Sequence, residues 1–444
     1  MPDLPSGGAR EADGHEAMVR FLVQGSAIAL ATRVAGVALG YLATILISRT
    51  LGAEGYGIYS IALAWALLLV VPARAGLDTA ALKFAPIYLE RQDYPRLRGF
   101  ISFAAACVLC LSALAGTAVI VAERLGLTSI PPGVSTATAL TIFPVAALAL
   151  VVAMLRAERR IFASQFYEQV LRPAVLIMLL VAAVLLARPI SASTAVFLGA
   201  ASAFAALVAG ALHARRALPL SAGDRDYSEW RQWLSLGGVL LATTVVQEAL
   251  NQVDIVMLGY LASPRDAGLF AAAWRIASLE SFAVAALTTV SGPLIASHFE
   301  KRDYAALASI ARSTARVGFV AALLICLPLA LAGPLILSLF GPEFAVAYPA
   351  LLWLLVGGIA NAFTGSVAYL MTMTGRHSHA LRIFAGALAI GFVLNLILIP
   401  RFSIIGAAIA STAATLCWNV AMLVYVRRTM GIDASALALG LRRG

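Results

Sequence analysis

The stretch Ile47–Ser60 reads ISRTLGAEGYGIYS and separates two long apolar segments with three glycines. A variant of this stretch returns at Leu258–Ala271 as LGYLASPRDAGLFA, in which Gly268 falls 211 residues after Gly57. Two further landmarks recur at nearly the same spacing, namely Glu90–Tyr94 with Glu300–Tyr304 and Arg215-Arg216 with Arg427-Arg428. A chain that repeats itself in one register is predicted to be a duplicated structural unit.

The composition is that of an integral membrane protein. Of the 444 residues, 61% are hydrophobic and 12% are charged, whereas soluble domains carry about 25% charged residues. A spanning helix needs about 20 apolar residues, and the sequence predicts twelve such helices, six in each half. They lie near 21–48, 56–86, 99–121, 134–155, 166–187, 192–212, 233–260, 267–296, 315–338, 346–372, 381–399 and 404–426.

The predicted fold is all-α, with two pseudo-symmetric six-helix bundles around a central cavity. An even number of helices per repeat gives both halves the same orientation, as in transporters built from parallel repeats. The bundles are expected over residues 21–212 and 233–426, joined by a polar cytoplasmic link over 213–232 that we expect to be mobile. Residues 1–20 and 427–444 are expected to be cytoplasmic tails.

The net charge of +10 agrees with this topology. With the N-terminus inside, 22 of the 32 Lys and Arg residues fall in cytoplasmic segments and five fall in outer turns. This bias follows the positive-inside rule and predicts a multi-pass protein with both termini in the cytoplasm. Nucleic acid is therefore not an expected partner, because the topology accounts for the charge.

One predicted helix carries a cluster of polar residues, namely Gln247, Glu248, Asn251, Gln252 and Asp254. At 100° per residue these side chains cover an arc of about 160°. Hydrogen bonding between helices explains such a face, and so does the lining of a hydrated cavity, which the two carboxylates favour. Gln247 and Asn251 are candidates for substrate contact, and Glu248 and Asp254 are candidates for binding a proton or a sodium ion.

Other ionisable residues interrupt apolar helices, where each charge costs about 2.5–3.5 kcal/mol. Arg33 and Arg275 have no obvious local partner, so an anion from another helix or from the substrate is expected beside each. Arg74 and Asp78 are four residues apart and can pair with each other. Arg74 nevertheless remains a candidate for substrate binding, and Asp78 and Glu280 are candidates for ion coupling.

Glu168 and Arg172 have the same four-residue spacing, and a structural ion pair is one explanation for them. No signature of catalysis accompanies any of these residues, since the sequence contains no phosphate-binding loop, HExxH or GxSxG. The four cysteines lie in apolar segments and lack a further ligand for a metal site. We therefore expect a protein that is not an enzyme and that needs no cofactor or metal.

Five stretches carry a family resemblance: RTLGAEGYGIYS, DIVMLGYLASPRDAGLFAAAWR from Asp254, FGPEFAVAYPALL from Phe340, TGR from Thr374 and NLILIPRFSIIGAAIA from Asn395. They resemble polysaccharide biosynthesis proteins of the O-antigen flippase type. That superfamily also holds the lipid II flippase and the multidrug/toxin-extrusion antiporters. The resemblance covers nearly the whole chain, but its motifs do not specify a substrate.

The resemblance implies a flippase of the bacterial cytoplasmic (inner) membrane. Its substrate would be a polyprenyl-pyrophosphate-linked oligosaccharide, such as an O-antigen, capsule or exopolysaccharide repeat unit, moved from the inner to the outer leaflet by alternating access. Relatives bind this lipid-linked anion with arginines of helices 1, 2 and 8, which here are Arg33, Arg74 and Arg275. The implied partners are membrane lipid and polysaccharide polymerase or glycosyltransferase machinery.

Alternative functions remain open. A multidrug or cation antiporter of the same superfamily would need acidic residues to dominate the cavity. A lipid II-type flippase is a second alternative, although that protein has two further C-terminal helices. A sugar polymerase or ligase would usually present a large outer loop, and an accessory membrane component without transport activity is the last alternative.

The repeat register also shows where the halves differ. The candidate charged residues have uncharged counterparts, so the fold itself does not require charge at these positions. The aligned pairs are Arg33 with Thr244, Arg74 with Ala285, Arg275 with Ala64, Glu248 with Val37 and Asp254 with Ala43.

Overall fold

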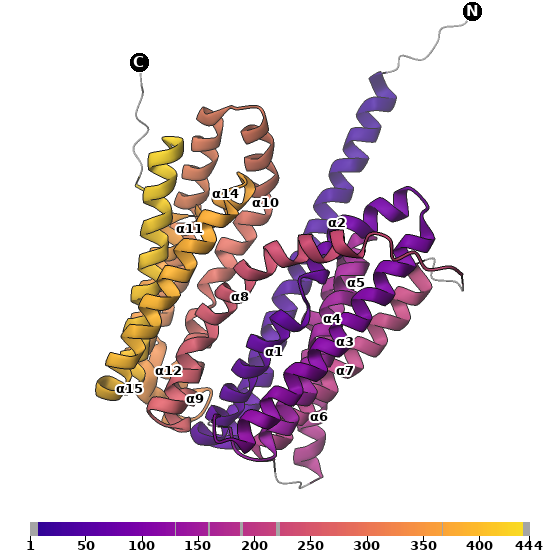
Figure 1. Ribbon diagram of the computed structural model, residues 1–444. Helices are drawn as coiled ribbons and strands as arrows, with labels where there is room; N and C mark the ends of the chain where they lie inside the picture. Colours follow the sequence, from indigo (N-terminus) through magenta and orange to yellow (C-terminus); the bar gives the residue numbers. More distant parts are fainter. Residues whose placement is uncertain are drawn as a thin grey trace, which may run out of the picture.

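The computed structural model describes residues 8–128, 130–158, 160–186, 190–218, 223–365 and 367–437, and within them the chain has no β-strand (Figure 1). The first half contains α1 (Gly8–Ala73), α2 (Leu77–Glu90), α3 (Tyr94–Arg124), α4 (Val134–Ala157), α5 (Ile161–Gln165), the π-helix η1 (Phe166–Leu171), α6 (Arg172–Leu185) and α7 (Ala192–Ala217). The second half contains α8 (Trp230–Leu261), α9 (Pro264–Ala277), α10 (Glu280–Glu300), α11 (Tyr304–Leu331), α12 (Gly333–Ser338), the 3₁₀ helix η2 (Pro342–Ala347), α13 (Tyr348–Thr364), α14 (Val367–Met373) and α15 (His377–Met430).

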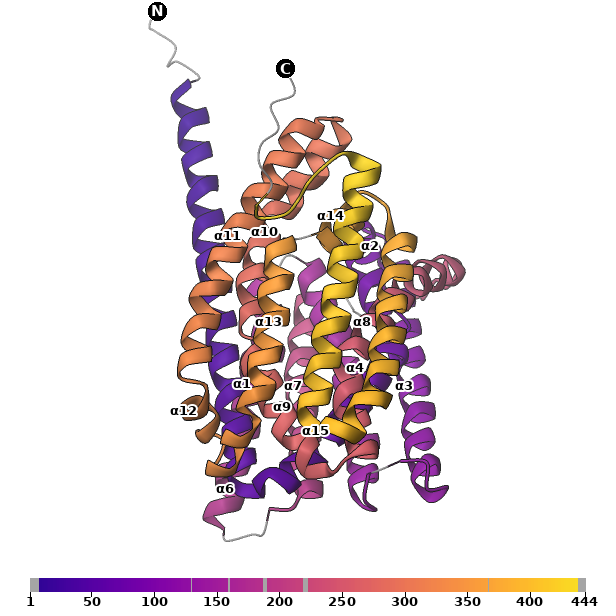
Figure 2. The same ribbon diagram turned by 90° about the vertical axis from the view of Figure 1, so that its left-hand side faces the viewer.

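Nine of the described helices are long and apolar enough to cross a membrane, and the chain is a multi-pass membrane protein. Two of these helices, α1 and α15, are each divided by one residue of positive φ, Gly52 at 67° and Ser403 at 47°. The chain bends at both points, at the end of the molecule opposite to the first and last described residues (Figures 1 and 2). The count of twelve spanning helices stays a prediction.

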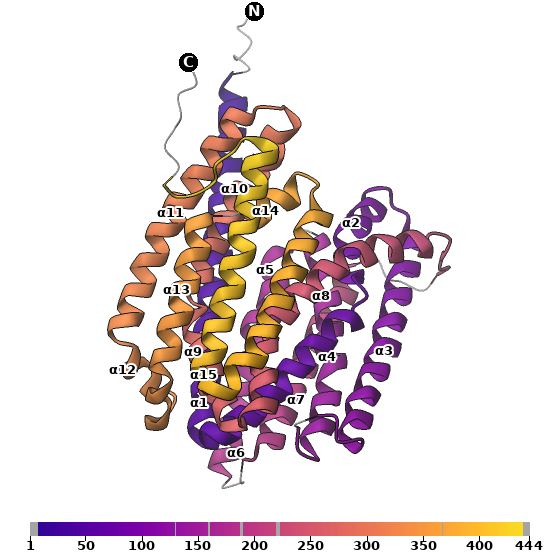
Figure 3. The same cartoon turned by 60° about the vertical axis from the view of Figure 1, so that its left-hand side comes forward.

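The helices form two groups. Helices α2–α7 gather on one side and α10–α15 on the other, with α1, α8 and α9 between them (Figures 1 and 3). The groups lie close together at the bend end and farther apart at the end where both chain termini lie (Figure 1). The residue bounds expected for the two lobes stay predictions.

The two glycines that mark the repeat pack against each other where α1 meets α9. A Cβ atom on Gly57 would lie 1.6 Å from the Pro264 carbonyl oxygen, and one on Gly268 would lie 2.2 Å from the Ala53 carbonyl oxygen. Only glycine allows two helix backbones to approach this closely. The repeated Gly-aliphatic-aromatic step is therefore a contact between the halves.

A second contact between the halves secures the bend at Gly52. Glu343 of η2 accepts a hydrogen bond from the Ala53 N–H at 2.7 Å, and its other oxygen lies 3.7 Å from Arg265. The Glu343 carboxylate thus caps the helical segment that restarts after Gly52, which would otherwise leave a free N–H group.

The segment before the bend is held by the same part of the second half. Ser48 donates to the Phe340 carbonyl at 2.9 Å, and the Arg49 Nε–H donates to the Leu339 carbonyl at 2.7 Å. Residues 339–343 of the second half therefore hold the bend of α1 from both sides. We call the three hydrogen bonds donated by Ala53, Ser48 and Arg49, together with the ion pair between Arg265 and Glu343, the bend latch.

The link between the halves is docked on the first half over its described part, residues 223–229, rather than free. Arg96 lies 3.2 Å from Asp226 and 3.5 Å from Glu229, and the Asp226 N–H donates to the Pro95 carbonyl at 3.0 Å. Three hydrogen bonds from Ser228 and Arg96 hold the pKa of Asp226 below its ordinary value, led by the Ser228 backbone N–H. The expectation of a mobile link is wrong for this segment, because the polar residues that suggested mobility form hydrogen bonds and ion pairs with the first half.

The first turns of α8 belong to the core of the first half. Trp233 is fully buried and packs edge-on against Phe100 at 5.3 Å between ring centroids, and its indole N–H donates to Tyr88 at 2.8 Å. Farther along, Gly237 lies against the backbone of Gly76, where a Cβ atom would be 2.3 Å from the Gly237 carbonyl oxygen. Helix α8 is thus shared between the halves.

Replacement of Trp233 tests this arrangement. We expect Trp233→Ala to destabilise the protein by about 3–5 kcal/mol, because it removes a fully buried indole and leaves a cavity. Trp230→Ala is the matched control, since Trp230 is 42% exposed. Thermal unfolding of both purified variants gives the measurement, and equal losses would contradict a specific role for Trp233.

The C-terminal segment also folds back onto the helices. Ile432 and Ala434 are buried, the Ala436 N–H donates to the Phe363 carbonyl at 2.9 Å, and Arg316 donates to the Ala436 carbonyl at 3.2 Å. The expected tail 427–444 thus begins inside α15 and continues as a docked segment to residue 437, beyond which it lies outside the described residues.

Candidate functional site

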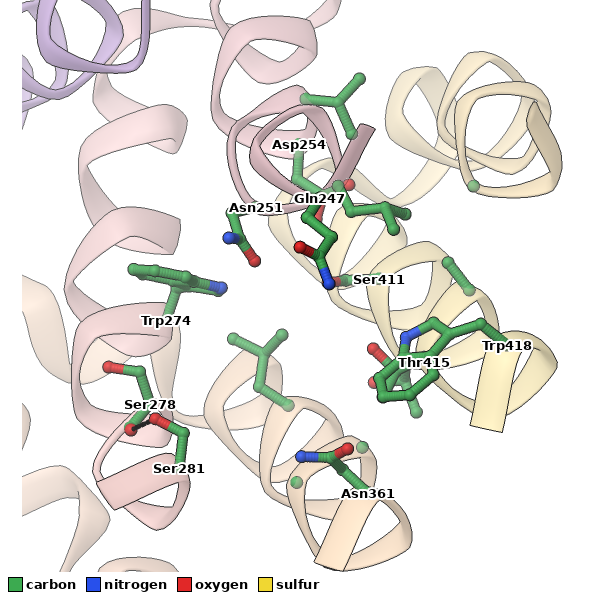
Figure 4. Close-up of a pocket in the computed structure, with 18 of the residues that line it drawn as sticks. Gln247, Asn251, Asp254, Trp274, Ser278, Ser281, Asn361, Ser411, Thr415 and Trp418 are labelled. Carbon is green, nitrogen blue, oxygen red and sulfur yellow. Dashed lines mark hydrogen bonds between the residues drawn. The ribbon is translucent and has the colours of Figure 1, made fainter. Parts of the chain in front are cut away.

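The second half of the chain encloses a cavity of about 600 Å³. Helices α8, α9, α10, α13, α14 and α15 supply its walls (Figure 4). All the residues that line this cavity belong to the second half of the chain. Its position follows from the polar face of α8, which turns toward α13 and α15.

The structure brings together five of the predicted site residues. Gln247, Glu248, Asn251 and Asp254 line the cavity from α8, and Glu280 lines it from the start of α10. The fifth polar residue of the α8 cluster, Gln252, is buried beside the cavity and donates to Glu248 at 2.8 Å. The polar face of this helix therefore fits both explanations, since it lines the cavity and since Asp254 accepts a hydrogen bond from Asn395 of another helix. The functional roles of the five residues stay predictions.

Two tryptophans face this cavity from opposite sides, Trp274 on α9 and Trp418 on α15 (Figure 4). Between them lie amide and hydroxyl groups, including Asn251, Asn361 and Thr415. Amides and hydroxyls both donate and accept hydrogen bonds, and an indole offers a flat apolar face with a polar edge. This combination suits a ligand with many hydroxyl groups and apolar C–H faces.

The charge of the lining is acidic. It contains Glu248, Asp254 and Glu280, and no Lys, Arg or His is among the described residues that line it. Asp254 accepts a hydrogen bond from Asn395 at 2.6 Å, and both are buried. Buried carboxylates need such partners or a cation, because desolvation penalises the charged form.

Glu280 is only partly satisfied. It is buried, and its Oε2 atom has no hydrogen-bond partner in the described part of the structure. Gly358 makes room for it, because a Cβ atom there would lie 2.7 Å from the Glu280 Cγ atom. The open oxygen leaves Glu280 able to bind a proton or a cation.

The three arginines expected to bind an anion do not line this cavity. Arg275 lies over the ring of Tyr41 at 5.3 Å, and Arg33 lies over Phe282 at 5.7 Å. Both therefore sit where α1 meets α9 and α10, at the junction of the halves. The Arg275 Nε atom is buried and has no hydrogen-bond partner in the described part of the structure.

Arg74 has a carboxylate partner four residues along the chain. It pairs with Asp78 at 3.2 Å, as its spacing allowed, with both side chains about a quarter exposed. Asp78 is likewise absent from the cavity lining. The anion-binding roles of the three arginines stay predictions, and Asp78 is engaged with Arg74.

Sequence reasoning missed the second-half residues that complete the site. These residues are Asn361, Asn395 and Trp274. Each lies in a predicted spanning helix, and the apolar residues around it dominate the hydropathy of that segment. An amide inside a spanning helix is itself a signal, because an unpaired polar group is costly in lipid. Asn361 and Asn395 are single amides outside any polar cluster, so they stand out less than the cluster in α8.

A family model described as polysaccharide biosynthesis protein matches residues 22–299. The chain belongs to that family. Within the curated proteins, the polysaccharide biosynthesis protein is similar to the probable flippase AglR of Haloferax volcanii, with 30% identity over 165 residues. The match covers 36% of this chain and 34% of that relative, so the chain matches about a third of the relative's length.

Solved structures show that this polysaccharide biosynthesis protein has the fold of the MOP superfamily. An inward-facing multidrug resistance MATE family transporter gives a TM-score of 0.68 at 13% identity, covering 91% of this chain and 98% of the other. The lipid II flippase MurJ in an inward closed conformation also gives a TM-score of 0.68, at 12% identity, and the match covers 91% of this chain and 87% of MurJ. A MOP superfamily transporter from Pyrococcus furiosus gives a TM-score of 0.58 at 14% identity, and the match covers 91% of this chain and 94% of that transporter.

Proposed function

We propose that the protein is a flippase that moves a lipid-linked oligosaccharide from the inner to the outer leaflet of the bacterial cytoplasmic membrane. The observation that supports this most directly is the second-half cavity, whose amides, hydroxyls and paired indoles suit a sugar headgroup. Its volume of about 600 Å³ holds a few sugar rings. Membership in the polysaccharide biosynthesis protein family supports the same substrate class.

In this proposal the anionic end of the substrate binds outside the cavity. Arg275 and Arg33 lie at the junction of the halves, and Trp274, next to Arg275 in α9, faces the cavity. Neighbouring residues of one helix would thus contact the pyrophosphate on one side and the sugars on the other. The prenyl chain would stay in lipid.

The membrane potential can drive this movement. A headgroup of about two negative charges that moves outward across ~100 mV, inside negative, gains roughly 4–5 kcal/mol. The acidic lining supports a second contribution, coupling to protons or sodium through Glu280, Asp254 or Glu248. It equally supports a cation antiporter of the same fold, because acidic residues do dominate this cavity.

A transport assay separates the proposals. Inverted vesicles that contain the protein are supplied with undecaprenyl-pyrophosphate-linked oligosaccharide on their outer surface. An impermeant glycosidase added outside then cleaves only the glycan that has not crossed, so the protected fraction measures the movement. We expect Asn251→Leu and Trp274→Ala each to slow this movement by about tenfold, which corresponds to the loss of one or two good contacts.

Trp353→Ala serves as the control, because Trp353 is 43% exposed and lies outside the cavity lining. Arg33→Ala and Arg275→Ala test the anionic end. If both arginine variants moved glycolipid at the normal rate, the anion-binding role would be wrong. Cation efflux without glycolipid movement would favour the antiporter.

A further inference from the structure

The first half contains a small cavity of about 50 Å³ that none of the roles above requires. It lies between α1, α4, α6 and α7, and its polar lining residues are Tyr59, Thr141, Arg172 and Ser202. A space of this size holds one or two waters or a single small ion, but neither a pyrophosphate nor a sugar ring.

Arg172 reaches this cavity because the helix around it is not regular. The Arg172 N–H bonds to the Tyr167 carbonyl, five residues back, and residues 166–171 form a π-helix. Pro173 contributes to this irregularity, since it has no N–H for the Gln169 carbonyl. Gly36 of α1 gives that carbonyl room, because a Cβ atom there would lie 2.6 Å from the Gln169 oxygen.

The π-turn also breaks the ion pair that the sequence suggested. In an α-helix Glu168 and Arg172 would face each other at four-residue spacing, whereas here no ion pair within 4.0 Å joins them. Arg172 has no hydrogen bond or ion pair among the residues that the structure describes, although Glu168 and Tyr59 are near enough for electrostatic interaction. A structural pair therefore does not account for Arg172.

Of the four polar side chains that line the cavity, two already donate to backbone carbonyls and two do not. The hydroxyls of Thr141 and Ser202 donate to the backbone carbonyls of Ala137 and Gly199, each at 2.8 Å. The Tyr59 hydroxyl has no hydrogen bond within the described ranges. Tyr59 and Arg172 thus offer free donors across one small space, and no carboxylate lines it.

We propose that this cavity binds a single small monovalent anion, such as chloride, between the Arg172 guanidinium and the Tyr59 hydroxyl. An unpaired arginine inside a spanning bundle is costly, and a bound anion supplies the missing charge. Charge-assisted hydrogen bonds from both donors would hold it. The site is separate from the second-half cavity and does not depend on the substrate carried there.

The test is thermal unfolding of the purified full-length protein in sodium chloride, bromide or gluconate at equal ionic strength. Gluconate is too large for the cavity and serves as the reference anion. We expect the Tm in saturating chloride or bromide to be about 2 °C higher than in gluconate. Arg172→Gln should abolish this difference, and Tyr59→Phe should raise the half-saturating chloride concentration about tenfold.

Gly199→Val is a second variant that should abolish the chloride-dependent rise in Tm. A Cβ atom on Gly199 meets nothing within 4 Å, so the new side chain fills cavity space without disturbing the fold and without touching the charge of Arg172. Arg124→Gln, which alters an exposed arginine at the end of α3, should keep the chloride effect. Equal Tm values in chloride and gluconate, or a chloride effect that persists in Arg172→Gln or Gly199→Val, would overturn the proposal.

Discussion

Gly57→Ala is expected to prevent the two halves from packing together. The added methyl would lie 1.6 Å from the Pro264 carbonyl oxygen, so α1 and α9 would have to move apart along their whole contact. We expect a loss of at least about 3 kcal/mol, at the upper end of overpacking costs, because the obstructing atom is backbone and cannot rotate away. Thermal unfolding and the yield of monodisperse protein give the measurement.

Gly386→Ala is the matched control for this substitution. A Cβ atom there meets nothing within 4 Å, and alanine is a better helix former than glycine by about 1 kcal/mol. Gly268→Ala should resemble Gly57→Ala, and the double variant should cost little more than either, since the helices are already apart. Native stability in Gly57→Ala would rule out the close contact.

Glu343→Ala is expected to weaken the bend latch. It removes the acceptor of the Ala53 N–H and the partner of Arg265. A hydrogen bond to a charged group contributes about 1.5–3 kcal/mol, which corresponds to a shift of about 10- to 150-fold in an equilibrium between joined and separated halves at this end.

The distance between spin labels on the two halves measures this shift. Leu127 and Leu335 are suitable positions, because they are 64% and 70% exposed and belong to different halves, in a background without the four cysteines. We expect a second, longer distance in Glu343→Ala. Glu343→Gln keeps an acceptor for the Ala53 N–H, so the longer distance should be less populated in that variant. Identical distance distributions in all three proteins would contradict a role of the latch in holding the halves together at this end.

The features that could be predicted from the sequence are those with a periodic or repeated signal. The register that paired Gly57 with Gly268 found two residues that meet in space, and the polar face of α8 was recognised because five polar residues stand out in an apolar helix. Both signals consist of residue identities at a regular spacing along the chain, so no knowledge of packing was needed.

What could not be predicted depends on packing between distant segments. The direction of Arg172 follows from a π-turn that Pro173 and Gly36 produce together, 137 residues apart. The position of Arg275 beside Tyr41, outside the cavity, follows from which side of α9 faces α1. Helical periodicity shows that a side chain has a face, but the neighbouring helix decides what that face meets.

Trp233 belongs to the second copy of the repeat by sequence and to the first half by packing. Its counterpart in the register is Leu22, at the start of the chain. The two copies have therefore become unequal, since the first half needs a side chain from the second to complete its core. A cut within the link at 219–222 would leave the amino-terminal fragment with an open socket at Phe100 and the carboxy-terminal fragment with an exposed indole, so neither piece is a self-contained unit.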